Sequence, residues 1–463
     1  MYRAGISDCE WLRFVVYYFH ANLNAGLGAG SVIKSFIFEK FKGYDRAVLW
    51  LEQITTLIGS NASGKSNAIE GIQILSELAS GRDLSVVFDG TKNSEGSIRG
   101  GAKGCCRYGA SSFLLGCTLD WDKKSDLLYR VRVNVSGRIM VEEESLYLVK
   151  NAQTDAVNGT VIFKASASDA DSGDIVVEYA NGKRGKNPEC RVLRSMSVLS
   201  QMQSRLPTDT VNYEDMIQKI RMTQDSLIQI FILDPVPSLM RGYSRVGDGT
   251  LRRNCNNISA VLYEIQKGKP TEWEDFCRIV KNLPENEIND IQFVKTQIND
   301  VILVQKEQNG KRLESIDAVR LSDGTLRCIA ALAAVMSEPE NSLIAIEEMD
   351  NGIHPSRVIK LMNALCEVAK KRNIDLILTT HNVTVLNGLG KQEILGVSVV
   401  YRDAETLASK IIPFVDIKNQ AGLLASGGLG DAMESEKLIE SIKNIAPNEP
   451  FSFDIEIAGD GYE

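Results

Sequence analysis

The first part of the chain alternates between short apolar runs and a longer amphipathic stretch. Three apolar runs have the length of strands, and turn residues separate them: 32–41, 47–51 and 54–58. Beyond residue 66, large apolar side chains recur every three positions, which is helical spacing: Ile69, Ile72, Leu75 and Leu78. This part therefore predicts strands followed by a helix with one buried face.

The rest of the chain changes character twice. Residues 110–180 alternate short apolar runs with turn-rich segments, which predicts antiparallel hairpins, whereas residues 205–319 predict mostly helices with polar faces. From residue 320 an alternation of helices and buried strands returns: helix 326–336, strand 342–346, a helix through 358–365 and strand 374–378. No repeat of fixed period appears, and no heptad run is long enough for a coiled-coil arm.

These patterns divide the 463 residues into five parts. We predict an N-terminal extension, an N-lobe with an antiparallel β region, a helical insertion, a C-lobe and an acidic tail, at residues 1–30, 31–204, 205–319, 320–430 and 431–463. The extension begins with an apolar run, but Asp8, Glu10 and Arg13 are wrong for a signal peptide.

Composition narrows the functional classes. A formal net charge of -8 argues against a protein that coats DNA, which needs a strongly basic surface, although a local basic groove stays open. The nine scattered cysteines and three histidines form no grouped metal-ligand pattern, and reduced thiols are typical of the cytoplasm. No apolar stretch approaches the ~20 residues of a membrane span. We expect a cytoplasmic protein without a membrane partner.

The strongest chemical signal is a glycine-rich loop between the third strand and the helix that follows. Residues 59–66 contain the full phosphate-binding pattern, with a further asparagine after it: Gly59, Ser60, Asn61, Ala62, Ser63, Gly64, Lys65, Ser66 and Asn67. In such a loop successive N–H groups and the helix N-terminus face phosphate oxygens. Lys65 is expected to reach the β- and γ-phosphates of ATP, and Ser66 to bind Mg²⁺.

Two later buried strands also end in polar groups. Strand 342–346 runs into Glu347 and Glu348, the arrangement of a Walker B motif, in which one carboxylate holds Mg²⁺ and the next orients or deprotonates water. Strand 374–378 runs through two threonines into His381, which can hydrogen-bond the γ-phosphate. Each pattern alone also fits an ordinary strand end, and their order along the chain favours the catalytic interpretation.

A helix N-terminus before the Walker B strand supplies a further candidate. Ser322, Asp323 and Gly324 open an apolar helix and resemble a signature motif that binds the nucleotide of a second subunit. An ordinary serine N-cap explains the same residues. A near-copy of this string occupies residues 247–252, so the string is not unique. We favour the later copy because it directly precedes the Walker B strand.

Taken together, these motifs resemble the ABC-type ATPases of the chromosome-maintenance (SMC), RecF and RecN group. Residues 33–67, and residues 347–355 with their Asn-Gly-Ile-His-Pro run, are similar to the bacterial ATPases called AAA-21 or AAA-15, which include the OLD, Septu, retron-associated and PARIS anti-phage proteins. The resemblance implies an α/β fold like an SMC head, an antiparallel β lobe and a helical insertion, without a long coiled coil.

The resemblance also implies roles for individual residues. Glu347 takes the Mg²⁺ position, Glu348 the catalytic base and His381 the switch histidine, and the dimer-facing D-loop is formed by Asp350, Asn351 and Gly352. Glu347 stands where aspartate is usual, and Ala62 replaces a frequent glycine, so the hydrolysis rate is expected to be low. Residues 99–101 are a candidate Q-loop, with a plain turn as the alternative.

Three functions compete at this level. The resemblance favours an ATPase that dimerises around ATP, or forms a higher oligomer, and controls a separately encoded effector such as a nuclease in response to DNA or a phage-derived trigger. The alternative is a RecF-like or SMC-like DNA clamp, for which the candidate basic face is Lys183, Arg184, Lys186, Arg191 and Arg194. A transporter subunit fits less well. The residues after His381 contain no nuclease pattern, so we expect the effector to be a separate chain.

Overall fold

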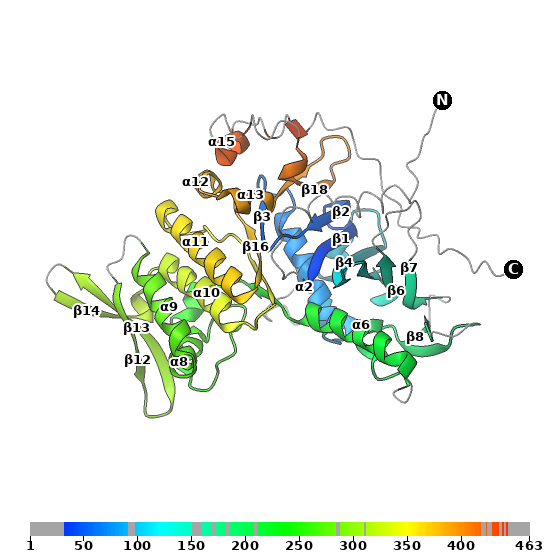
Figure 1. Cartoon of the computed structure of the whole chain (residues 1–463), viewed down its shortest axis with the longest axis horizontal. Helices are drawn as coiled ribbons and strands as arrows, with labels where there is room; N and C mark the ends of the chain where they lie inside the picture. Colours follow the sequence, from blue (N-terminus) through cyan, green and yellow to red (C-terminus); the bar gives the residue numbers. More distant parts are fainter. Residues whose placement is uncertain are drawn as a thin grey trace.

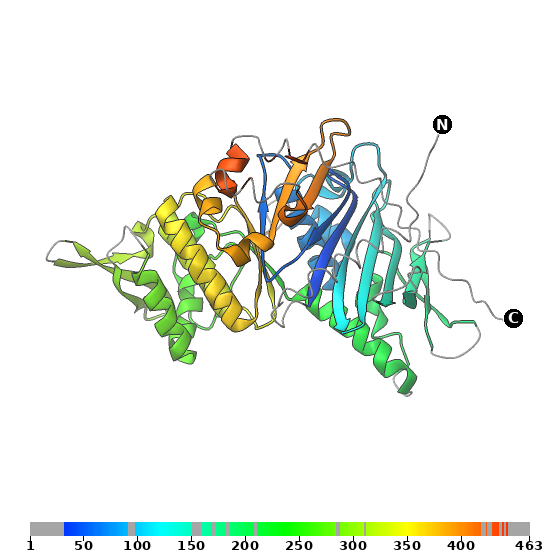
Figure 2. The same ribbon diagram turned by 45° about the horizontal axis from the view of Figure 1, so that its top comes forward.

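The computed structural model describes residues 32–90, 98–150, 159–167, 172–181, 186–207, 211–283, 288–309, 312–417, 423, 428–434, 438 and 441–442. The predicted extension at residues 1–30 and most of the predicted tail lie outside the described residues. Within them, one sheet of fourteen strands runs through the molecule in the order β10-β15-β16-β3-β17-β18-β2-β1-β4-β5-β6-β7-β8-β9. Figure 2 shows this sheet as a continuous twisted surface.

One half of the sheet is a parallel core. Its strands are short and almost wholly buried: β10 (Ile230–Leu233), β15 (Leu343–Ile346), β16 (Asp375–Thr379), β3 (Ile54–Ile58) and β17 (Val397–Arg402). They pair in parallel throughout this half. Parallel strands present their carboxyl ends at one edge, and ligands of open α/β sheets bind there.

The other half is antiparallel, as the hairpin pattern predicted. Strand β18 (Ser409–Pro413) joins it to the core, and the remaining strands are β2 (Tyr44–Trp50), β1 (Ile33–Phe41), β4 (Ser112–Asp122), β5 (Ser125–Asn134), β6 (Met140–Lys150), β7 (Gly159–Ser166), β8 (Asp174–Tyr179) and β9 (Glu189–Leu193). Alternate side chains of these strands enter a core with helix α2 (Lys65–Ala79) and helix α6 (Val211–Ile228). Both helices lie across the strands in Figure 1.

Helices also enclose the parallel core. Helix α10 (Asp323–Ser337) and helix α11 (Pro355–Arg372) pack in a second hydrophobic cluster with β15 and β16. Because most residues of α10 are apolar, nearly its whole surface is buried. The remaining short helices are α3 (Leu84–Asp89), α4 (Gly101–Cys105), α5 (Val198–Met202), α12 (Val383–Asn387), α13 (Lys391–Leu395) and α15 (Leu429–Glu434).

The predicted helical insertion contains strands as well as helices. Helices α7 (Pro237–Met240), α8 (Ile258–Gly268) and α9 (Pro270–Lys281) lie beside a small antiparallel sheet of β11 (Ser244–Arg245), β12 (Ile288–Lys295), β13 (Asp300–Asn309) and β14 (Arg312–Asp317). Figure 1 shows this sheet at the end of the molecule opposite β8. The expectation that residues 205–319 are mostly helical was therefore incomplete, and β10 within them belongs to the parallel core.

The α/β class, the antiparallel lobe and the lack of a long coiled coil are confirmed for the described part of the chain. Its longest helices, α6 and α11, have 18 residues each. None of the described helices is long and apolar enough to cross a membrane. The C-lobe core reaches further than predicted, because Leu438 and Ile442 are buried with Phe414 in one apolar cluster. The segment predicted as a solvated acidic tail thus begins as part of the core.

Candidate active site

The glycine-rich loop leaves the parallel core at the carboxyl end of β3. Gly59 (φ 148°), Ala62 (φ 62°) and Gly64 (φ 127°) all have positive φ, which curls the backbone before α2 begins at Lys65. A Cβ on Gly59 would lie 2.1 Å from the carbonyl oxygen of Val400, so only glycine fits there. Ala62 adopts the left-handed region at a cost of about 1 kcal/mol, which explains the usual glycine. The loop has the shape of a phosphate cradle.

Two side chains shape this loop from within. The buried hydroxyl of Tyr44 donates a hydrogen bond to the carbonyl oxygen of Gly64 (2.9 Å). Lys65 folds back over the loop, and its Nζ donates to the carbonyl oxygens of Gly59 (2.6 Å) and Ser60 (3.0 Å). These two hydrogen bonds hold Lys65 over the loop, where the lysine of a phosphate-binding loop reaches the phosphates.

Lys65 lies in the field of two carboxylates from the loop after β15. Burial lowers the pKa of Lys65, and the negative charges of Glu348 and Asp350 oppose that shift. The side chain of Asp350 is buried, and its Oδ1 atom has no hydrogen-bond partner among the described residues. A buried acceptor without a donor is costly, and it is explained by a group that joins the site later. The P-loop and the Walker B segment thus form one site.

The two Walker B glutamates differ in environment. Glu347 is half-buried, and burial raises its pKa, while the nearby charge of Arg99 opposes that shift. Glu348 is exposed, has φ 45°, and its N–H donates to the Thr379 hydroxyl (2.8 Å). The exposed carboxylate of Glu348 accepts a hydrogen bond from Asn351 (3.2 Å) and is open to water, as the predicted base requires, whereas the half-buried carboxylate of Glu347 suits a metal-binding role.

The strand ends also bring His381 close to the loop. Thr379, the last residue of β16, pairs with Leu57 of β3, so His381 and Gly59 both follow two residues after this pair. His381 is exposed, and the next residue, Asn382, caps helix α12 through Thr384 (3.0 Å). The geometry thus brings together the candidates from three strands at one edge of the sheet.

The predicted signature residues lie at the start of α10. Ser322 accepts a hydrogen bond from the N–H of Thr325 (3.1 Å), which makes it an N-cap, and Arg241 pairs with Asp323 (2.6 Å). Within the D-loop, Asp350 is buried in its own chain, whereas Asn351 and Gly352 are exposed. The N-cap interpretation is confirmed. A role of these residues toward a second subunit stays a prediction.

Sequence reasoning overlooked two partners of Glu347. Asp234 follows the last residue of β10, and it adds negative charge near Glu347, whereas Arg253 adds positive charge. The signal for Asp234 was present, because residues 230–233 form an apolar run that ends in a carboxylate, as β15 does. Because residues 205–319 were predicted to be mostly helical, this strand end was not recognised.

The candidate Q-loop is anchored to the P-loop helix. The N–H of Arg99 donates to the buried carboxylate of Glu70 on α2 (2.6 Å), and its guanidinium pairs with the same carboxylate (3.2 Å). Lys42 makes a third contact to Glu70 (2.6 Å). The segment 99–101 therefore borders the site, and assigning it the Q-loop role remains a prediction.

Protein ligands for Mg²⁺ are few at this edge. The described residues contain no cluster of three histidine, cysteine or acidic side chains that could hold a metal ion. Nucleotide-bound Mg²⁺ is usually held by one or two side chains, phosphate oxygens and water. Ser66 at the start of α2 and Glu347 at the end of β15 fit that sparse pattern.

The basic face considered for DNA is only partly supported. Arg194 is buried and donates to the carbonyl oxygens of Val141 (2.9 Å) and Ser172 (2.9 Å), so it is a structural residue. Lys186 is exposed and pairs with Glu189 (2.9 Å). Lys183 and Arg184 lie outside the described residues.

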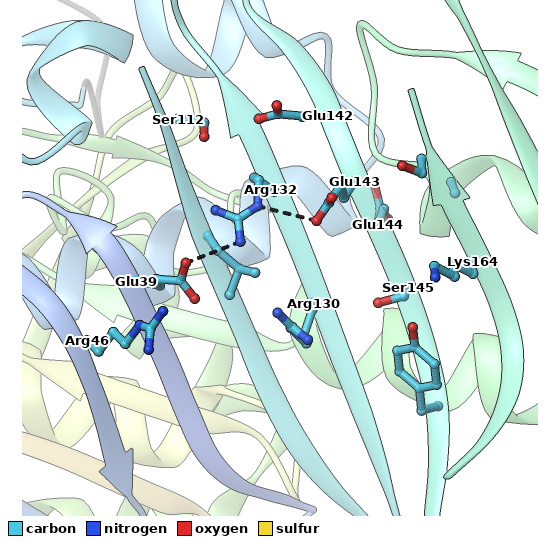
Figure 3. A pocket seen from close by; sticks show the side chains of 14 residues that line it. Glu39, Arg46, Ser112, Arg130, Arg132, Glu142, Glu143, Glu144, Ser145 and Lys164 are labelled. Carbon is cyan, nitrogen blue, oxygen red and sulfur yellow. Dashed lines mark hydrogen bonds and ion pairs between the residues drawn. The ribbon is translucent and has the colours of Figure 1, made fainter. Parts of the chain in front are cut away.

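A separate hollow of about 580 Å³ lies on the outer face of the antiparallel sheet. Figure 3 shows Arg132 between Glu39 and Glu143, to which it pairs at 3.2 and 3.3 Å. Leu114 lines the hollow, while its neighbours Phe113 and Leu115 point into the core with α2, so hollow and P-loop helix are on opposite faces. This hollow is no part of the candidate active site.

One family model matches part of the chain. Residues 200–387 match the family model described as "AAA domain, putative AbiEii toxin, Type IV TA system". This match includes the Walker B segment, His381 and the signature candidates. A comparison with curated proteins found no match. Residues 200–387 are therefore similar to this AAA domain family, whereas the glycine-rich loop at residues 59–66 lies outside the matched range.

Among solved structures, the chain is similar to SMC head domains. An SMC head bound to the C-winged helix domain of ScpA has a TM-score of 0.45 at 15% identity and covers 82% of this chain and 97% of that one. The SMC head from Thermotoga maritima gives 0.39 at 14%, covering 82% and 98%. An SMC head from Pyrococcus furiosus with an extended coiled coil gives 0.43 at 14%, covering 89% and 99%.

Proposed function

We propose that this chain binds and slowly hydrolyses Mg-ATP, that two copies enclose the nucleotide, and that the ATP-bound dimer controls a separately encoded effector. The observation that carries the nucleotide half is the convergence of Lys65, Glu348 and His381 at the carboxyl edge of β3, β15 and β16. A P-loop alone binds phosphate, and the carboxylate and histidine beside it add what hydrolysis requires.

Each group has a defined task in this proposal. The curled loop directs N–H groups at the phosphates, and Lys65 exchanges its carbonyl partners for phosphate oxygens. Ser66 and Glu347 would hold Mg²⁺, which neutralises charge on the phosphate oxygens. Glu348 orients and deprotonates the attacking water, and His381 contacts the γ-phosphate. The half-buried setting of Glu347 and the glutamate in place of aspartate are consistent with slow turnover.

A second copy follows from the place of the signature candidates. Ser322 caps the N-terminus of α10, and the same chain already provides a complete P-loop at Lys65 for its own nucleotide. In this proposal the α10 N-terminus meets the nucleotide of the partner copy. The ATP cycle is proposed to act on another protein.

The effector is proposed to belong to a defence or toxin system, most simply a nuclease. The matched family model is described by a toxin of a type IV toxin–antitoxin system, and the motif resemblance is to anti-phage ATPases. A DNA or phage-derived trigger would then bias the ATP-bound state. The DNA-clamp alternative loses one of its candidate cations, because Arg194 is buried.

The nucleotide half is tested by calorimetry of ATP binding. Lys65→Ala removes the cation over the cradle, and ATP affinity is expected to fall at least about tenfold, equivalent to about 1.4 kcal/mol. Lys103→Ala, at an exposed lysine in α4, is the matched control and should bind ATP like the wild type. Equal ATP affinity of wild type and Lys65→Ala would overturn the assignment.

A further inference from the structure

The near-copy of the signature string, residues 247–252, has no role in the proposed function, yet the structure brings it to the active site. The loop returns to the carboxyl end of β10, where the N–H of Asp234 donates to the carbonyl oxygen of Arg253 (3.0 Å). Two residues on, the N–H of Val236 donates to the carbonyl oxygen of Asn254 (3.1 Å). These two bonds hold the loop in line with the strand next to β15.

The loop is rigidly built around one buried amide. Asn257 is 1% exposed, and its Nδ2 donates to the carbonyl oxygens of Asp248 (3.1 Å) and Thr250 (2.7 Å). Its Oδ1 accepts from the N–H of Arg252 (3.1 Å). One side chain thus satisfies three backbone groups of the loop, which restricts it to a single conformation. Such a fixed loop presents the next residue, Arg253, in a defined place.

Arg253 lies at the end of β10, the strand next to β15. Its backbone is bonded to Asp234, and Leu233 of β10 pairs with Ile346 of β15, so Asp234 and Glu347 are neighbours at the strand ends. The backbone of Arg253 is therefore bonded to the strand end next to the one that carries Glu347.

The guanidinium of Arg253 has weak polar contacts within the described residues. Its Nη2 lies 3.9 Å from Asp234 Oδ2, which is too long for a hydrogen bond. Its Nε atom is buried and has no hydrogen-bond partner among the described residues. A buried donor without an acceptor is destabilising, so an anionic group that reaches this guanidinium would be stabilised. Arginine presents such a fork to phosphate oxygens.

We infer that Arg253, presented by loop 247–257, binds the terminal phosphate of ATP in its own subunit. This inference rests on the proposed function, because it assumes that Lys65 holds the nucleotide. The cation would neutralise charge at the γ-phosphate, near the strand end that carries Glu347. ADP lacks this phosphate, so Arg253 would bind ATP and not ADP. The loop that carries Arg253 would then respond to which nucleotide is bound.

The test compares ATP and ADP affinity in the full chain, using Glu348→Gln as the background so that ATP is not consumed. Adding Arg253→Ala should weaken ATP binding at least about tenfold, while ADP affinity changes less than about threefold. Adding Arg253→Lys should restore part of the ATP affinity, because it keeps the charge and loses the fork. Arg245→Ala, at an exposed arginine in β11, is the control and should leave both affinities unchanged.

Melting temperatures of the variants show whether the fold is kept. If Arg253→Ala lowers ATP and ADP affinity equally, or lowers neither, the inference is wrong. A Lys65→Ala chain measured alongside should lose affinity for both nucleotides. If Lys65→Ala also leaves both affinities intact, or the wild type binds neither nucleotide, the proposed function fails and the inference falls with it.

Discussion

A Cβ atom on Gly324 would lie 2.6 Å from the carbonyl oxygen of Gly352. The first turn of α10 therefore rests directly on the D-loop backbone. Asp350 of the same loop is buried toward Lys65. Residues 350–352 thus connect the chain's own P-loop with the N-terminus of α10, which is proposed to serve the partner copy. A structural change at the P-loop can therefore be transmitted to this helix end.

Gly324→Ala should disturb this contact. The nearest neighbours of the new methyl group are backbone atoms of Gly352 and Ile353, which cannot rotate away, so the D-loop or the α10 N-terminus must shift. We expect a loss of stability of about 1–3 kcal/mol and at least tenfold slower ATP hydrolysis. Gly268→Ala is the control, because no atom lies within 4 Å of its Cβ position and its φ is not positive. Melting curves and phosphate release check both; wild-type hydrolysis in Gly324→Ala would contradict the coupling.

Complementation tests the shared site. A Lys65→Ala chain and a Ser322→Arg chain should each be inactive alone, because each dimer then lacks one component at both sites. Mixed in equal amounts, half of the dimers combine the two chains, and each of these keeps one intact site, so about a quarter of wild-type hydrolysis should return. Activity that never exceeds that of either variant alone would count against a site shared between copies.

Glu338 should make stability depend on pH. Burial raises its pKa to about 7, and Arg372 opposes the shift. Because the folded pKa is above the unfolded value, the folded state binds more protons, so this contribution is present at low pH and is lost as pH rises through about 7. Between about pH 5 and pH 8 the wild type should lose on the order of 2 kcal/mol relative to Glu338→Gln.

Chemical denaturation of both chains at several pH values measures this difference. Glu340→Gln, at an exposed neighbour, is the control and should follow the wild type. Parallel pH profiles for wild type and Glu338→Gln would show that the Glu338 carboxyl is not protonated in the folded state.

Local patterns predicted the elements whose burial follows directly from their sequence. The strand at β3, the helix α2 and the loop between them are contiguous, so periodicity and the glycine spacing were sufficient. Strand β10 has only four residues and lies among helices, and its burial comes from pairing with β15, which is distant in sequence. Asp234 and Arg253 could not be assigned to the site from the sequence for the same reason. Only the pairing of β10 with β15 places Glu347 near them.

Charge patterns were less informative than apolar ones. The sequence placed Arg194 in a candidate basic surface. It is instead buried, and it donates hydrogen bonds to carbonyl oxygens of two other segments. Conversely, Leu438 and Ile442 stand in an acidic segment and still enter the core, because α12, α15 and β17 provide an apolar surface for them. In each case the deciding contact is long-range, and sequence spacing does not contain it.

The most direct test of the account is the nucleotide that remains bound to Glu348→Gln after incubation with Mg-ATP. Glutamine keeps the size of the side chain and removes the base, so the variant should bind ATP and fail to cleave it. Chromatography of the extracted nucleotide should find ADP with the wild type, ATP with Glu348→Gln, and neither with Lys65→Ala. Recovery of ADP from Glu348→Gln at the wild-type rate would contradict the assignment of Glu348 as the base.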